Sequence, residues 1–224
     1  MGIAVASTLG LLLSLAGGLF FAIDAQAATT PVGLGTAQTY SVLAATAVTN
    51  TGNTNLVGDL GLSPSDATSI TGFPPGIVYG QTHAADAVAL QAQADLTTAY
   101  DNAASRPASI LPSAELANQT LVDGVYSASG AALSLNGILT LDGANDPSST
   151  WIFQTDSTLI TGTDSHVVLI NGAQACNVYW KVTSSATLGT SSTFTGAILA
   201  LTSITVAHGA VVDGQALARN AAVT

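Results

Sequence analysis

Small side chains that carry a hydroxyl or a methyl group recur at fixed spacing in six short segments of the sequence. In each of these tetrapeptides the third residue is apolar, and the second and fourth residues are mostly Thr, Ser, Ala or Asn. Regularly spaced hydroxyls can hold ordered water, and the methyl groups between them offer apolar area. The six segments are residues 46–49, 133–136, 157–160, 184–187, 202–205 and 221–224.

The second and fourth residues of each tetrapeptide share one face, because side chains alternate along a β-strand. The apolar third residue is expected to point into a core, which turns the other two outward. On stacked strands such residues repeat about every 6.6 Å along a strand and about every 4.8 Å between strands. None of the twelve is charged. The candidate surface residues are Ala47, Thr49, Ser134, Asn136, Thr158, Ile160, Ser185, Thr187, Ser203, Thr205, Ala222 and Thr224.

This array would be level, stiff and neutral. Threonine suits it because the β-branch restricts χ1, so that hydroxyl and methyl stay in register. Charged side chains would hold disordered hydration, whereas small groups can hold an ordered water layer. We therefore expect a surface that fits a periodic solid made of water, namely ice.

Other interpretations of the same residues stay open at this point. Threonine is common on solenoid faces simply because of its high β propensity. A face rich in Ser and Thr could also bind sugars, act as an adhesive surface, or stack against another chain.

Catalysis is not expected. Parallel β-helices also occur as polysaccharide lyases and hydrolases, which need convergent carboxylates or a basic residue as acid or base. Asp142, Asp146 and Asp164 stand beside Gly, Pro or Ser, where turns favour aspartate. The sequence also lacks a nucleophile-elbow motif.

The amino-acid composition argues against nucleic-acid-binding proteins, disulfide scaffolds and metalloproteins. Thirteen acidic and three basic residues give a net charge of −10, which opposes nucleic-acid binding, and 48% hydrophobic residues are enough for a core. The lone Cys176 cannot build a disulfide scaffold, and we expect it to be a buried small hydrophobe. The histidines are scattered, so we expect no metal site and no cofactor. They are His83, His166 and His208.

One helix is expected over about residues 82–104, a stretch without Gly or Pro, with Thr82 as N-cap and 106–107 closing it. An apolar stripe should pack this helix on a core. The stripe is Val88, Ala92, Leu96 and Tyr100.

The remaining sequence reads as short strands separated by turn residues. Eleven-residue windows of the sequence can be aligned with one another. The steps are 18 and 19 residues between the windows 177–187, 195–205 and 214–224, and 27 residues from 150–160 to 177–187. Two further windows, 126–136 and 39–49, align less closely. This period is typical of a parallel β-solenoid with a triangular section, whose coils must stack to bury their apolar sides. Lys181 and Arg219 are expected on a solvated face.

The N-terminus resembles a secretion signal. Residues 3–23 form a nearly continuous apolar run, and Ala25-Gln26-Ala27 fits cleavage after Ala27. The alternative is an uncleaved membrane anchor, since the run is long enough to span a bilayer. We expect a signal peptide at 1–27, a single exported domain at 28–224, and no membrane contact after cleavage.

Several longer segments are similar to one known family. They include LGTAQTYSVLAATAVTNTG near the start, GDLGLSP, THAADA, TWIFQT, NGAQACNVYWKV and DGQALARNAAVT. On these residues the chain resembles the microbial β-solenoid ice-binding family, whose domain was long catalogued as being of unknown function. The resemblance runs from about Gly33 to Thr224.

The resemblance implies a right-handed parallel β-helix of triangular section with one long α-helix alongside, in which coil order differs from sequence order. It also implies a secreted, monomeric antifreeze protein for cold adaptation that adsorbs to the ice crystal surface, giving thermal hysteresis and ice recrystallisation inhibition. Family faces often read Thr, Ala or Gly, any residue, then Thr or Asn. Residues 46–49 fit this pattern fully, whereas 157–160 depart most, with an outward Ile160. The alternative is a secreted adhesin or carbohydrate-binding β-solenoid.

Overall fold

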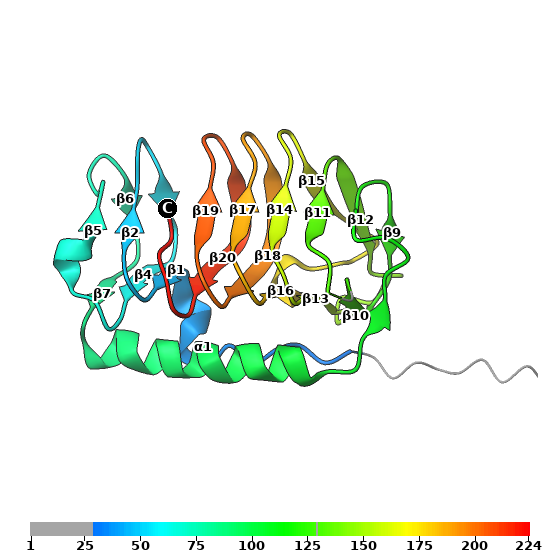
Figure 1. Cartoon of the computed structure of the whole chain (residues 1–224), viewed down its shortest axis with the longest axis horizontal. Coiled ribbons are helices and arrows are strands. Elements are labelled where there is room, and N and C mark those ends of the chain that lie inside the picture. The colour runs from blue at the N-terminus through cyan, green and yellow to red at the C-terminus, as the bar shows by residue number, and fades with distance from the viewer. Residues whose placement is uncertain (1–28, 129) are drawn as a thin grey trace, which may run out of the picture.

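The computed structural model describes residues 29–128 and 130–224, which form a parallel β-solenoid with three faces and one α-helix alongside it (Figure 1). The expected solenoid and its accompanying helix are confirmed. The apolar run at 3–23 and the cleavage site after Ala27 lie outside the described residues. Among the residues that are described, no helix is both long and apolar enough to cross a membrane.

The first face, here called the helix face, is a parallel sheet that α1 covers. Its strands pair one after another along a single path, so that each strand between the two ends, β7 and β8, has a parallel neighbour on both edges. In spatial order they are β7 (Thr82–Ala84), β4 (Asp59–Leu62), β1 (Tyr40–Ala44), β20 (Val211–Ala218), β18 (Thr193–Ala200), β16 (Val178–Val182), β13 (Trp151–Thr155), β10 (Gly124–Ser127) and β8 (Ser109–Ile110).

The other two faces consist of shorter strands. The hydroxyl face comprises β11 (Leu133–Leu135), β14 (Leu159–Thr161), β17 (Ala186–Leu188), β19 (Ile204–Val206), β2 (Val48–Thr49) and β5 (Ile70–Thr71). The third face comprises β9 (Thr120–Leu121), β12 (Ile138–Asp142), β15 (His166–Ile170), the first halves of β18 and β20, β3 (Asn55–Leu56) and β6 (Ile77–Val78). Short 3-10 turns lie at Gly35–Thr39, Ala67–Ser69 and Ala175–Asn177.

Coil order in space differs from order in the sequence, as the resemblance implied. The chain's first coils follow its last one, because Val42 in β1 pairs with Ala216 in β20. In Figure 1 the blue and cyan strands therefore lie beyond the red C-terminal strand. The middle of the stack is thus a junction between residues far apart in the chain.

Strands β18 and β20 each turn a corner of the triangle at a glycine. Gly196 and Gly214 are register partners and have φ of 106° and 156°. A Cβ on Gly214 would lie 2.1 Å from the carbonyl oxygen of Gly196, and one on Gly196 would lie 2.5 Å from that of Val178. No side chain fits such a close approach of backbone to backbone.

The interior is lined by buried apolar side chains and contains a stack of aromatic rings. Ring centroids are 5.8 Å apart for Tyr126 and Phe153, 4.1 Å for Phe153 and Trp180, and 4.9 Å for Trp180 and Phe194. Register pairing places the first three rings directly above one another. Stacked rings of this kind hold successive coils in one register.

Helix α1 (Ala87–Ser105) begins later than predicted. Thr82 is not its N-cap but pairs with Leu60 as part of β7, and the Asp86 carboxylate instead accepts a 2.8 Å hydrogen bond from the Ala89 amide. Pro107 stops the helix, because the residue before a proline avoids helical geometry. Of the predicted stripe, Val88 is exposed, since Ala89 takes the buried position in the first turn.

Polar contacts fasten the end of α1 to the helix face. The Gln154 side chain donates to the carbonyls of Ala103 and Arg106, which satisfies groups that a helix end leaves without partners. The Tyr100 ring has two cations close to it, with Lys181 Nζ at 5.6 Å and the Arg219 guanidinium at 4.8 Å from its centroid.

Two expectations from the sequence are wrong here. Lys181 is buried and not on a solvated face, because α1 covers its strand and its ammonium donates to Asp156 (2.9 Å) and Thr183 (2.7 Å). Cys176 is exposed and not buried, because it lies in the short turn before β16.

Candidate functional site

The hydroxyl face brings together most of the predicted surface residues. Strand register places one outward residue from each coil in a single column that crosses the whole face. Except for the half-buried Ser134, all members are exposed. In spatial order the column reads Ser134, Ile160, Thr187, Thr205, Thr224, Thr49 and Thr71.

A second column, two residues upstream in each coil, runs parallel to the first. Its members are half-buried and small, so their side chains do not protrude beyond those of the first column. Between the two columns the intervening residues point inward: Leu159, Ala186, Ile204, Val223 and Val48 are buried. The second column contains Thr158, Ser185, Ser203, Ala222, Ala47 and Ser69.

Hydrogen bonds between coils fix several hydroxyls. Thr224 Oγ1 donates to Thr205 Oγ1 at 3.3 Å. Ser185 Oγ lies 2.9 Å from Ser203 Oγ and 2.8 Å from Thr202 Oγ1. These contacts limit rotation of the side chains, so the surface presents its hydroxyls at fixed positions.

The position of Asn136 departs from the sequence prediction. Leu133, not Leu135, pairs with Leu159, so this coil is shifted by two residues and Ser134 occupies the place assigned to Asn136. The sequence alignment matched Tyr126 with Thr150, whereas the structure pairs Tyr126 with Phe153, an offset of three residues. One extra residue at the following corner, where Tyr126 to Leu133 spans seven residues and Phe153 to Leu159 spans six, reduces this offset to two. Asn136 therefore lies beyond the column.

Glu115 closes this end of the hydroxyl face. Its carboxylate accepts hydrogen bonds from the Ser134 hydroxyl (2.9 Å), the Asn136 side chain (2.6 Å) and the Asn136 amide (2.9 Å). Burial raises the pKa of Glu115, but these bonds and one from the Ala117 amide outweigh it and hold the pKa below its ordinary value. The charge thus marks the edge of an otherwise neutral surface.

The row formed by Ser69 and Thr71 was not among the residues predicted from the sequence. Residues 68–71 read Thr-Ser-Ile-Thr, identical to residues 202–205. Thr71 pairs with Thr49 in the last row of the face. The repeated tetrapeptide was the available signal for this coil.

The acidic residues considered as catalytic candidates are engaged in turns. Asp142 accepts from the Ala144 amide and the Asn171 side chain, both at 2.8–2.9 Å. Asp146 accepts from the amide and hydroxyl of Ser148. Within residues 29–128 and 130–224 there is no group of three or more His, Cys, Asp or Glu side chains that could hold a metal ion.

Comparison with known proteins gives consistent matches over nearly the whole described chain. Residues 42–224 match the family model described as Ice-binding-like. The ice-binding protein of Nostoc sp. (strain HG1) is 48% identical over 206 residues, which is 91% of this chain and 75% of that protein.

Solved structures match as well. The ice-binding protein of the Antarctic ascomycete Antarctomyces psychrotrophicus superposes with a TM-score of 0.82 at 42% identity, covering 87% of this chain and 95% of that one. An ice-binding protein from an Antarctic biological consortium gives a TM-score of 0.85 at 48% identity over 89% of this chain and 90% of that one.

Proposed function

The chain belongs to the Ice-binding-like family, and from that premise we propose that it binds ice through the hydroxyl face. The carrying observation is the geometry of that face: seven coils present one column of Thr, Ser and a single Ile, with a second small-residue column beside it. No residue in either column is charged. Family membership and this surface support the same ligand.

The proposed mechanism is adsorption of a rigid protein face to a rigid solid. Hydroxyls held between coils, such as those of Thr205 and Thr224, position water, and the methyl groups beside them leave bulk water when the lattice is reached. Adsorbed molecules pin the growing ice front, which curves between them. Curvature lowers the local freezing point, giving thermal hysteresis, and slows recrystallisation.

The proposal extends to the protein's location, oligomeric state and partners. We propose an exported monomer that acts without a metal, a cofactor or catalysis, and that binds neither nucleic acid nor membrane once its signal is removed. A net charge of −10 opposes binding to nucleic acid, and the turn roles of Asp142 and Asp146 oppose their use as catalytic acids or bases.

Labelling at Cys176 tests ice binding directly. This thiol is exposed and lies in a turn before a strand of the helix face, so a maleimide dye there leaves the hydroxyl face free. The labelled protein should concentrate on defined planes of a single growing ice crystal and should shape that crystal. Dye excluded from the crystal, together with binding on a glycan array, would instead identify a carbohydrate-binding solenoid.

A further inference from the structure

A half-buried amide lies at a corner of the solenoid where other coils have mostly apolar side chains. This corner joins the hydroxyl face to the third face, and the residue that directly follows the first column turns inward there. The coil of Thr49 has Asn50 at this place, and burying an amide costs free energy unless its polar atoms find partners. In four other coils the residue is Leu135, Thr161, Leu188 or Val206.

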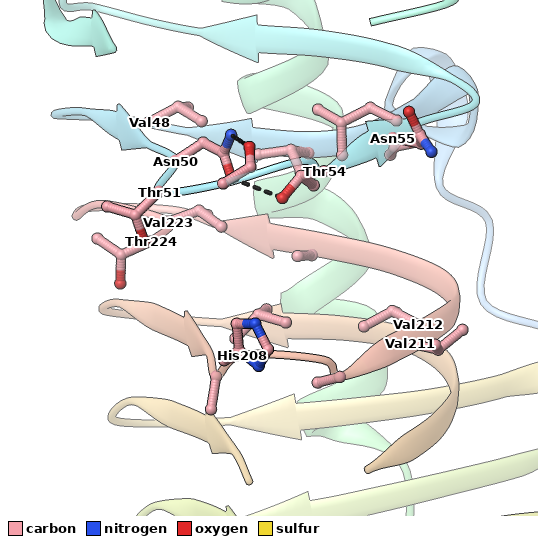
Figure 2. Close-up of a pocket in the computed structure, with 18 of the residues that line it drawn as sticks. Val48, Asn50, Thr51, Thr54, Asn55, His208, Val211, Val212, Val223 and Thr224 are labelled. Carbon is pink, nitrogen blue, oxygen red and sulfur yellow. Dashed lines mark hydrogen bonds between the residues drawn. The ribbon is translucent and has the colours of Figure 1, made fainter. Parts of the chain in front are cut away.

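Both polar atoms of the Asn50 side chain have partners. Its Nδ2 donates hydrogen bonds to the carbonyl oxygens of Gly52 (2.8 Å) and Gly72 (2.9 Å), and its Oδ1 accepts one from the Thr54 hydroxyl (2.6 Å). Figure 2 shows Asn50 and Thr54 turned toward each other. Gly52 and Thr54 belong to the same coil as Asn50. Gly72 belongs to the next coil, where it directly follows Thr71. One side chain thus joins two coils at the point where both leave the hydroxyl face.

The two coils are in close contact around this amide. A Cβ atom on Gly72, whose φ is 80°, would lie 1.9 Å from the Asn50 carbonyl oxygen. A Cβ atom on Gly76 would lie 2.6 Å from Asn50 Nδ2. Because neither position has room for a side chain, the corner leaves the amide little freedom to move.

The row of Thr71 has few other contacts to hold it. Strand β5 pairs with β2 through only two residues on each strand, Val48 with Ile70 and Thr49 with Thr71. Among the described residues β5 has no strand on its other edge. The backbone N–H of Asn50 donates to the Thr71 carbonyl at 3.0 Å, so residue 50 binds the next coil through both its backbone and its side chain.

A second coil has a comparable link at the same corner. Thr161, which follows Ile160 of the first column, accepts a 2.9 Å hydrogen bond at Oγ1 from the backbone N–H of Gly189 in the next coil. A polar residue at this corner therefore goes with a hydrogen bond that ties two neighbouring rows together.

We propose that Asn50 is a positioning residue for ice adsorption: its amide holds Thr49 and Thr71 in register, so that both hydroxyls meet the same lattice. Asn50 is not itself an ice contact, because its polar atoms are bonded within the protein. Without the amide, Thr71 can move relative to Thr49, and this end of the face loses its regular spacing. The inference rests on the ice-binding role proposed for the hydroxyl face.

Asn50→Leu tests the proposal, with Gln154→Leu as its matched control. Leucine occupies the same corner in two other coils, so the first variant fills the corner and loses the hydrogen bonds. The Gln154 amide also donates to two backbone carbonyls, at 2.7 and 2.9 Å, but it lies on the helix face. Both variants should lower the unfolding temperature by about 5 °C. Only Asn50→Leu should need about tenfold more protein for the same hysteresis, since two positions of about fourfold each are lost.

Double variants separate positioning from a general loss of stability. Adding Asn50→Leu to Thr71→Tyr should change hysteresis little, because the ring has already displaced ice from these rows. Added to Thr187→Tyr, which lies three rows from Thr49, Asn50→Leu should still cost about tenfold, because distant sites act independently. If Asn50→Leu does not fold, Asn50→Asp keeps the shape and the acceptor for Thr54, and the same results are expected.

Three results would each overturn a different statement. Parental hysteresis in Asn50→Leu, together with a loss in Thr205→Tyr, would refute the positioning role and leave ice binding by the hydroxyl face intact. Equal losses of hysteresis in Asn50→Leu and Gln154→Leu would refute it as well, because stability alone would then account for both. Parental hysteresis in Thr205→Tyr would refute the proposed function of the face and, with it, the role of Asn50.

Discussion

Replacing Thr205 with tyrosine should separate the hydroxyl face from ice. Each position covers about 32 Å² of the face, so at 25 cal/mol per Å² it contributes at most about 0.8 kcal/mol to adsorption. The ring would cover its own position and displace ice from the adjacent Thr187, Thr224 and Ser203. Losing four positions removes about 3 kcal/mol, which is about a hundredfold in affinity.

The assay is thermal hysteresis measured against protein concentration, with the unfolding temperature as a check on the fold. Thr193→Tyr is the matched control, because Thr193 is equally an exposed strand residue but lies on the third face. Thr205→Tyr should need about a hundredfold more protein for the same hysteresis, and Thr193→Tyr should behave like the parent. Full activity of Thr205→Tyr, or equal losses in both variants, would refute the assignment of the face.

Three further substitutions separate binding from stability. Ile160→Thr adds a hydroxyl to the exposed column and should strengthen ice adsorption about twofold, measured as hysteresis; a decrease would show that the column does not need hydroxyls there. Glu115→Gln should cost about 1–2 kcal/mol of unfolding free energy at neutral pH. Since the folded-state pKa of Glu115 is lowered, its contribution is present above the unfolded-state pKa of about 4.3 and is lost as pH falls through the folded pKa. The difference in unfolding free energy between the two proteins should therefore disappear at acidic pH; a difference that stays constant with pH would contradict this. Tyr100→Ala removes the ring that Lys181 and Arg219 contact and should lower the unfolding temperature by roughly 10 °C while leaving hysteresis near 0 °C unchanged; the reverse pattern would place Tyr100 in the binding surface.

Local regularities in the sequence were enough to predict the solenoid and most of the hydroxyl face. Apolar third positions such as Ala186 and Ile204 recur at a nearly constant step, and the side-chain alternation of strands then fixes which residues face out. The prediction failed in the coil that contains Leu133, because Leu133-Ser134-Leu135 fits the alternation equally well with Leu133 or Leu135 paired to Leu159, and a shift of two residues leaves every side chain on the same face.

Burial on the helix face was harder to predict. Lys181 alternates with apolar residues, a pattern that ordinarily marks a solvated side, yet α1 covers this side. A sheet buried on both faces loses the clean alternation that identifies its outer side. Which face of the solenoid the helix covers, and the order in which the coils stack, depend on contacts between distant segments that no short window contains.

The junction between β1 and β20 has a consequence for how the chain reaches its native state. Val42 is synthesised long before its strand partner Ala216. During translation the first coils therefore have no neighbouring strand on that side until almost the whole chain has been made. High contact order slows folding, and here it also means that the solenoid cannot assemble progressively from one end. A nascent or truncated chain that lacks residues 211–218 would leave both halves with open edges, and we expect such chains to aggregate and not to fold partially.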